Sequence, residues 1–180
     1  MEMKADIVYN QLLKTAKYLL KELEYYGENQ FKQRISENHW TIGEYYDFLV
    51  NSTLNYYLPQ IQECLNSKTG SGEGKKRFKG KFVFWYGRIP AIMKYEDLTS
   101  YKPEQPESPE KMKDTIYKFI KIMSKTAQDI DASESKGKTK HPIFGMLTAL
   151  EWFKLIEINF SHSLKKKMEI DRVLRNVDLE

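Results

Sequence analysis

The sequence predicts an all-α protein, a four-helix bundle in which the helices run up, down, down and up. Two observations support this prediction. Apolar residues recur at helical spacing in four segments of the 180-residue chain. About forty residues, from 68 to 108, separate the second segment from the third. A connection of that length can run the full length of a bundle, so the two helices that it joins are expected to be parallel.

The first two expected helices lie in the N-terminal third of the chain. The first covers about residues 4 to 26 and has an apolar face formed by Val8, Leu12, Leu19 and Leu23. The second begins at "TIGE", where Thr41 and Glu44 can form a capping box. Its core stripe comprises Ile42, Tyr45, Phe48, Leu49, Ser52 and Tyr56. Pro59 then either kinks this helix or ends it.

The last two expected helices also have clear start signals. The third begins at "SPEK", with Ser108 as N-cap and Pro109 in the first turn. Its inward residues are Met112, Ile116, Phe119, Met123 and Ala127. The fourth begins at "TALE", where Thr148 and Glu151 repeat the capping-box pattern. The run "LKKK", 164–167, lies late in this helix, where cations suit the helix dipole.

Composition indicates a soluble protein with one domain, residues 1–180. Lysine and arginine number 29 against 25 acidic residues, which gives a net charge of +4 spread thinly along the chain. The lone Cys64 cannot form an internal disulfide, which favours a reducing compartment. The N-terminus lacks the apolar core of a signal peptide, and no run approaches the ~20 apolar residues that span a bilayer. We therefore expect a cytoplasmic protein with no membrane partner.

The crossover contains two patterns that have a functional and a structural interpretation. "GSGEGKK" lacks the spacing and the Ser or Thr of a phosphate-binding loop, which favours a flexible loop. "KFVFWYGRIP" is expected to be a short strand or an apolar flap with its aromatic side chains packed on the bundle. The cations in this region are Lys75, Lys76, Arg77, Lys79 and Lys81, and they interleave with Phe78, Phe82 and Phe84. Such a cluster could contact nucleic acid, but a solvated loop margin is the favoured interpretation.

Three histidines suggest a zinc site, but the expected geometry argues against it. His39 precedes the second helix and His141 precedes the fourth, so they belong at opposite ends of the bundle if these helices are antiparallel. His162 lies some fourteen residues into the fourth helix, ~20 Å along its axis. Metal bonds of ~2.1 Å cannot join all three imidazoles.

Three stretches carry a resemblance to a known superfamily. They are "HWTIGEYYDFLVNST", the crossover with "GRIPA", and "HPIFGMLTALEWFKLIEINFSHSLKKKMEID". Together they resemble the DinB-like (DinB/YfiT-like) superfamily, and most closely its branch of uncharacterised bacterial proteins of unknown function. The resemblance implies an up, down, down, up four-helix bundle that is often a homodimer. It also implies relatives that are thiol-dependent transferases or isomerases using a divalent metal.

The resemblance implies where a metal site would lie in this chain. The superfamily has one histidine eight residues beyond the tryptophan that opens the second helix, and two more at i and i+4 in the fourth helix. These positions correspond to Phe48, Asn159 and Ser163, with His162 as a nonligating neighbour. Phe48 cannot bind a metal, and the oxygens of Asn159 and Ser163 are weak ligands for zinc or nickel. The implied metal site is therefore degenerate, and we expect no metal cofactor.

The face of the fourth helix that carries these positions begins apolar and turns polar. Trp152, Ile156, Asn159, Ser163 and Lys166 follow one another at steps of four and three. In a structural interpretation, Asn159 and Ser163 bond to each other, to Ser52 of the second helix or to ordered water. In a functional interpretation, a pocket formed by Phe48, Ser52, Asn159, His162 and Ser163 holds a small organic molecule without a metal.

These observations lead to three functional hypotheses. The preferred one is a metal-independent protein that binds a small ligand or acts through interactions, including a homodimer. The first alternative is an S-transferase-like enzyme that depends on a divalent metal or a thiol. The second alternative is weak nucleic-acid binding through the loop from Lys75 to Lys81. The sequence contains no Ser–His–Asp set or paired carboxylates that indicate acid–base or nucleophilic catalysis.

Overall fold

The computed structural model describes residues 3–34, 36, 39–67, 74–90 and 99–177. The chain is mostly helical, which confirms the predicted all-α class apart from a two-stranded sheet. The elements are α1 (Ala5–Glu22), η1 (Leu23–Tyr25), α2 (Glu28–Lys32), α3 (Ile42–Ser52), η2 (Thr53–Tyr57), α4 (Leu58–Asn66), α5 (Phe78–Tyr86), α6 (Pro109–Ala132), β1 (Lys138–His141), β2 (Gly145–Thr148) and α7 (Ala149–Val177). Within the described ranges, none of the helices combines the length and apolarity needed to cross a membrane.

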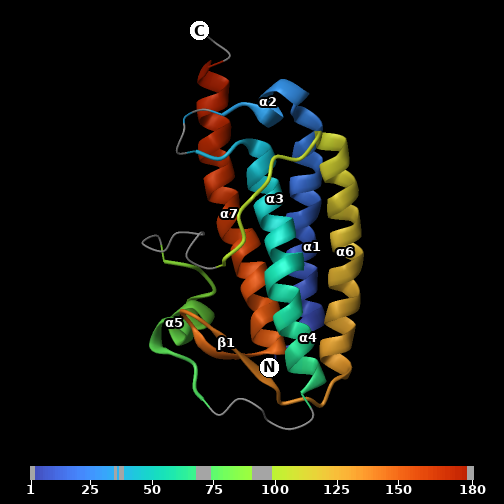
Figure 1. The fold of residues 1–180 in the computed structure, drawn as a ribbon, viewed down its shortest axis with the longest axis vertical. Coiled ribbons are helices and arrows are strands. Elements are labelled where there is room, and N and C mark those ends of the chain that lie inside the picture. The colour runs from blue at the N-terminus through green and yellow to red at the C-terminus, as the bar shows by residue number, and fades with distance from the viewer. Residues whose placement is uncertain (1–2, 35, 37–38, 68–73, 91–98, 178–180) are drawn as a thin grey trace.

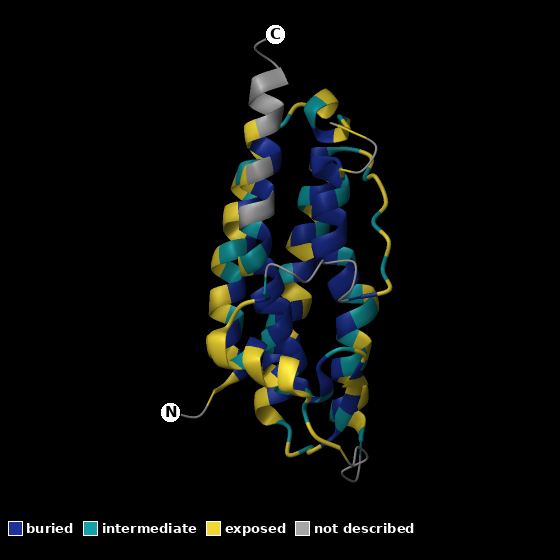
Figure 2. Ribbon diagram, turned by 90° about the vertical axis from the view of Figure 1, so that its left-hand side faces the viewer, coloured by how far each residue is buried: buried dark blue, intermediate teal, exposed yellow. Residues whose placement is uncertain are grey.

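Four long helical segments lie side by side along the molecule: α1, α3 with α4, α6 and α7 (Figure 1). In this view α1 and α7 run upward, whereas α3 with α4 and α6 run downward. The buried residues line the inner sides of these segments (Figure 2). The middle of α7 is buried on nearly every side, since every residue from 152 to 160 except Lys154 is buried.

The predicted helix starts are confirmed. The Thr41 hydroxyl accepts from the Glu44 amide at 3.0 Å while the Glu44 carboxylate accepts from the Thr41 amide at 2.9 Å. Thr148 and Glu151 form the same pair of hydrogen bonds before α7. The Ser108 hydroxyl accepts from the amide of Lys111 at 3.2 Å. Each cap satisfies amides that a helix start would otherwise leave unpaired.

The second long helix changes its backbone pattern before Pro59 instead of ending there. Residues Thr53–Tyr57 form a π-helical turn, in which the amide of Leu58 donates to the carbonyl of Thr53. α4 then continues through Pro59 to Asn66. The wider turn advances the side-chain register by about one residue. As a result Tyr57 is buried, whereas Tyr56, which the sequence pattern placed in the core stripe, is only half-buried.

The described part of the crossover contains a helix where the sequence suggested a strand or flap. α5 covers Phe78–Tyr86 and ends at Gly87, whose φ of 62° lies in the left-handed region that glycine tolerates. Only Val83 and Gly80 of this helix are buried, and Phe84 is half-buried. The other aromatic side chains are exposed, so the expectation that they pack on the bundle is wrong for most of them. Residues 68–73 and 91–98 of the predicted crossover lie outside the described residues.

A buried aspartate fastens the end of the crossover to α3. One carboxylate oxygen of Asp47 accepts from the Tyr101 hydroxyl at 2.7 Å and from the Glu104 amide at 2.8 Å. The other accepts from the Asn51 side chain at 2.6 Å. Burial and the neighbouring Asp47 raise the pKa of Tyr101, so its phenol stays a donor. These contacts guide the chain toward the start of α6.

A buried lysine joins the end of α1 to the later part of α7. Lys167 is 1% exposed, and its Nζ lies 2.9 Å from Glu22 Oε2 and 2.7 Å from Asp171 Oδ2. The Tyr26 hydroxyl donates to the other oxygen of Asp171. Burial and this hydrogen bond raise the pKa of Tyr26 far above its ordinary value, so the phenol remains protonated. One buried ammonium group thus bridges two carboxylates from different helices.

Replacement of this lysine is predicted to destabilise the protein. Lys167→Met keeps most of the apolar part of the side chain but leaves Glu22 and Asp171 without their cation, and we expect a loss of about 3 kcal/mol in the free energy of unfolding. Urea denaturation followed by circular dichroism measures this loss. The control is Lys125→Met, since Lys125 forms an exposed pair with Asp129 that contributes less than about 1 kcal/mol. Equal losses in both variants would contradict the prediction.

Candidate functional site

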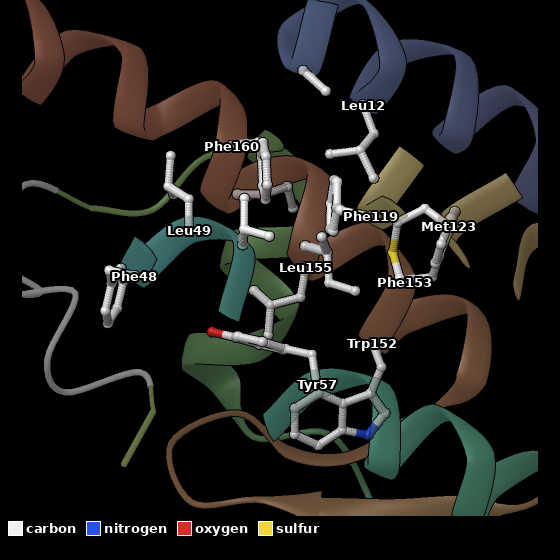
Figure 3. Packing of buried hydrophobic residues seen from close by; sticks show 14 of the residues in the cluster. Leu12, Phe48, Leu49, Tyr57, Phe119, Met123, Trp152, Phe153, Leu155 and Phe160 are labelled. Atoms are coloured by element: carbon white, nitrogen blue, oxygen red, sulfur yellow. The ribbon is translucent and has the colours of Figure 1, made fainter. Parts of the chain in front are cut away.

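Phe48, the first implied metal position, is a packing residue of α3. Its buried ring lies with its centroid 4.7 Å from that of Trp40 and 6.4 Å from that of Tyr101. Phe48 therefore joins the entry of α3 to the end of the crossover. Figure 3 shows it at the margin of the aromatic cluster, away from Trp152.

Asn159 and Ser163, the other two implied positions, are both buried in α7. The Asn159 side-chain nitrogen donates to the hydroxyl of Tyr57 at 2.7 Å. The Ser163 hydroxyl donates to the carbonyl of Phe160 at 2.7 Å, and the Ser163 carbonyl accepts from Tyr45 at 2.7 Å. The expected partners, Ser52 or each other, are thus replaced by Tyr57 and by the backbone of α7. The side chain of Lys166 lies outside the described part of the chain.

The two remaining residues of the predicted pocket, Ser52 and His162, lie in different environments. Ser52 is buried at the last position of α3, directly before the π-helical turn. His162 is half-buried on α7. The π-helical turn brings Tyr57 to Asn159, and sequence reasoning missed Tyr57 because it assumed an uninterrupted helical period. A π-turn in a long helix is itself a frequent mark of a functional region.

An aromatic cluster lies beside Asn159. The ring centroids of Tyr57 and Trp152, both labelled in Figure 3, are 5.8 Å apart. Those of Tyr56 and Trp152 are 6.1 Å apart. The His141 ring also lies near Trp152, with 5.2 Å between the centroids, and stacks on Phe144 at 4.4 Å. Burial raises the pKa of Tyr57, against the opposing effect of the Asn159 hydrogen bond, so its hydroxyl stays protonated at neutral pH.

The His141 ring stabilises the backbone of the "HPIFG" stretch. Its Nδ1 accepts from the amides of Ile143 and Phe144, at 3.1 and 3.3 Å. An imidazole nitrogen that accepts two amides cannot carry a proton, so the proton lies on Nε2 and the ring is neutral. The ring thereby shapes the turn between β1 and β2, which pair antiparallel from Lys138 with Thr148 to His141 with Gly145.

The side-chain oxygen of Asn159 and the indole nitrogen of Trp152 are buried without a hydrogen-bond partner among the described residues. A buried polar atom without a partner costs about 1–3 kcal/mol, and water or a small polar molecule usually relieves this cost. The arrangement can therefore bind a hydrogen-bonding group, whereas it brings together no acid–base pair.

The histidines are distributed along the molecule. His39 precedes α3 at one end, His141 lies in β1 at the other end, and His162 lies within α7 (Figure 1). In the part of the chain that the structure describes, no three His, Cys, Asp or Glu side chains gather in a way that could hold a metal ion.

A surface depression of about 530 Å³ lies at the end of the molecule where α1 begins, and it includes none of the predicted pocket residues. Its lining includes Asp131 of α6. The two oxygens of Asp131 accept from the amides of Ala5 and Asp6, at 2.8 and 3.0 Å. This carboxylate therefore caps the start of α1, which favours a structural role for it.

The hydrogen bond between Asn159 and Tyr57 predicts a measurable effect on stability. Tyr57→Phe removes the only partner shown for the buried Asn159 amide, and we expect the free energy of unfolding to fall by about 1–3 kcal/mol. Thermal and urea denaturation check this result. Tyr56→Phe removes a hydroxyl from the half-buried neighbouring ring and is expected to change stability far less. A larger effect for Tyr56→Phe would show that Asn159 does not depend on Tyr57.

Comparisons with known proteins do not identify a family. No protein-family model matches the chain, and no curated protein matches it. The resemblance to the DinB-like superfamily and the metal positions that it implies therefore stay predictions drawn from the sequence.

Proposed function

We propose that this protein is a four-helix bundle of the up, down, down, up type, similar to the DinB-like superfamily, that works as a metal-independent binding protein. The directions of α1, α3 with α4, α6 and α7 support the proposed arrangement (Figure 1). The length of chain between α4 and α6, of which residues 67, 74–90 and 99–108 are described, supports the predicted crossover. A homodimer, as the resemblance implies, belongs to the same proposal.

One observation carries the proposal: protein contacts already occupy all three implied metal positions. The Phe48 ring packs on Trp40, Asn159 donates to Tyr57, and the Ser163 hydroxyl donates to its own helix. None of these side chains is an imidazole or a thiolate, the ligands that zinc and nickel prefer. A metal would have to displace core contacts and would gain only weak oxygen donors.

Asn159 is the group that we propose contacts a ligand. Its side-chain oxygen lacks a partner among the described residues, and its neighbours Tyr57 and Trp152 are aromatic. A few polar atoms among apolar side chains are typical of sites for small organic molecules. The ligand expected here is small and mainly apolar, with one hydrogen-bond donor for Asn159.

The environment of Cys64 does not support the competing hypothesis of a thiol-dependent enzyme. Its sulfur is buried and lies 3.5 Å from both the Thr139 hydroxyl and the Leu147 carbonyl. Burial raises the pKa of the thiol, against the opposing hydrogen bond from Thr139. Reactive cysteines instead combine exposure with a lowered pKa. An enzyme of this kind would therefore need an external thiol and a metal.

The metal content of the purified protein tests the proposal. We expect protein prepared without an affinity tag to contain far less than one transition-metal ion per chain, because Phe48, Asn159 and Ser163 offer no strong ligand. Elemental analysis by mass spectrometry measures this content. One tightly held zinc or nickel ion per chain would refute the metal-independent proposal and favour the enzyme.

A designed variant tests whether the implied positions are correct. Phe48→His combined with Asn159→His and Ser163→His restores three imidazoles, and we expect it to bind nickel or zinc with at least a hundredfold gain over the natural chain. Isothermal titration calorimetry measures the gain. The matched control combines Asn159→His and Ser163→His with Ser52→His, so that the third imidazole lies one helical turn farther along α3. If circular dichroism shows folded protein and neither variant binds, the alignment behind these positions is wrong.

A further inference from the structure

α5 presents a stripe of aromatic side chains to solvent. Phe78 is 84% exposed, Trp85 85%, Tyr86 54% and Phe82 41%. Positions 78, 82, 85 and 86 fall on one side of a helix, and the stripe is about 12 Å long. Figure 2 shows α5 in front of the bundle with most of its residues exposed. Aromatic side chains exposed together in this way indicate a binding surface.

The opposite side of α5 is fixed to the protein, so the stripe cannot turn inward. Val83 is buried, and a side chain at Gly80 would meet the carbonyl of Phe144, because a Cβ there would lie 2.6 Å from its oxygen. The Arg77 amide donates to the same carbonyl at 2.8 Å, and the Arg77 guanidinium donates to Pro142 at 2.7 Å. Lys76 forms an ion pair with Glu151 of α7. The hairpin turn thus holds the base of α5.

Cations flank the aromatic stripe. Residues 74–90 contain six lysines and arginines and no Asp or Glu. Two of the cations, Lys76 and Arg77, contact the protein, and the other four, Lys75, Lys79, Lys81 and Arg88, are exposed. At 100° per residue, Lys79 and Lys81 lie on opposite sides of the stripe. The surface therefore offers rings in its middle and positive charge along both margins.

We propose that this α5 surface binds single-stranded nucleic acid. Bases would stack on Trp85 and Phe78, whose rings are almost fully exposed, while Lys79 and Lys81 would contact phosphates. An anionic membrane is the less suitable partner, because the side of α5 opposite the stripe holds the buried Gly80 and Val83 and not the strongly charged polar face of an in-plane membrane helix. A second copy of the chain is also less suitable, because it would bring two positively charged α5 surfaces together. This inference is independent of the ligand proposed at Asn159.

The test is fluorescence anisotropy of a labelled oligothymidylate of about 12 nucleotides titrated with the full chain at about 50 mM salt. We expect binding that weakens linearly with the logarithm of salt concentration. Trp85→Ala is expected to weaken binding about tenfold through lost stacking. Lys79→Gln with Lys81→Gln is expected to flatten the logarithmic salt slope by about 1.4, since each phosphate contact contributes about 0.7 on a single strand.

Matched controls separate α5 from the rest of the surface. Tyr25→Ala removes another exposed aromatic ring, and Lys118→Gln with Lys121→Gln removes two exposed charges from α6. We expect these control variants to bind the oligonucleotide within about twofold of the natural chain, whereas Trp85→Ala binds it about tenfold more weakly. The residues changed on α5 are exposed, so circular dichroism and the thermal midpoint should match those of the natural chain.

Three results would overturn the inference. The first is no anisotropy change at low salt. The second is an equal loss of affinity in the α5 and control variants, which would mean diffuse electrostatic binding. The third is a Trp85-dependent association with vesicles containing phosphatidylserine, or a Trp85-dependent dimer in sedimentation, without oligonucleotide binding. That result would assign the stripe to a membrane or to a second copy.

Discussion

The structure depends on the burial of the middle of α7 on nearly every side. Every residue from 152 to 160 except Lys154 is buried, so this helix has no solvent face along that length. Any polar side chain there must find a partner in the protein or hold a guest molecule. Glu157 meets this requirement through Lys154 and Ser161. Just beyond this stretch, the buried Ser163 hydroxyl donates to the carbonyl of Phe160. Asn159 meets it only in part, because its nitrogen is bonded to Tyr57 while its oxygen is not satisfied among the described residues.

The features that the sequence predicted well depend on residues a few positions apart. Thr41 with Glu44 and Thr148 with Glu151 are three residues apart, so their caps can be recognised before any tertiary structure is known. The core stripe of α3 likewise follows a local period. Tyr57 was missed because one π-helical turn shifts that period by a residue, and the signal for the turn is weak: Thr53 bonds back to Leu49, and Pro59 lacks an amide proton.

The features that could not be predicted depend on long-range contacts. Lys167 lies in a run of lysines that the sequence analysis related only to the helix dipole, yet its partner Glu22 is 145 residues away in the chain. The exposure of the α5 aromatics has the same kind of cause. A stretch rich in Phe, Trp and Tyr is expected to pack inward, but the contact between Gly80 and Phe144 selects which side of α5 faces the protein. Apolar composition therefore predicted burial for side chains that tertiary contacts direct outward.

The hairpin between β1 and β2, which contains the "HPIFG" stretch, uses its side chains for structural contacts. His141 uses the lone pair of Nδ1 for two backbone amides, so that nitrogen is not available to a metal. Gly145, with φ of 86°, leaves room for the backbone of Lys75 and Arg77, and Phe144 both stacks on His141 and holds the Arg77 amide. The same turn therefore packs on Trp152 beneath it and supports α5 beyond it. These contacts give the stretch a structural role, because its loss would disturb both the core around Asn159 and the placement of the exposed stripe.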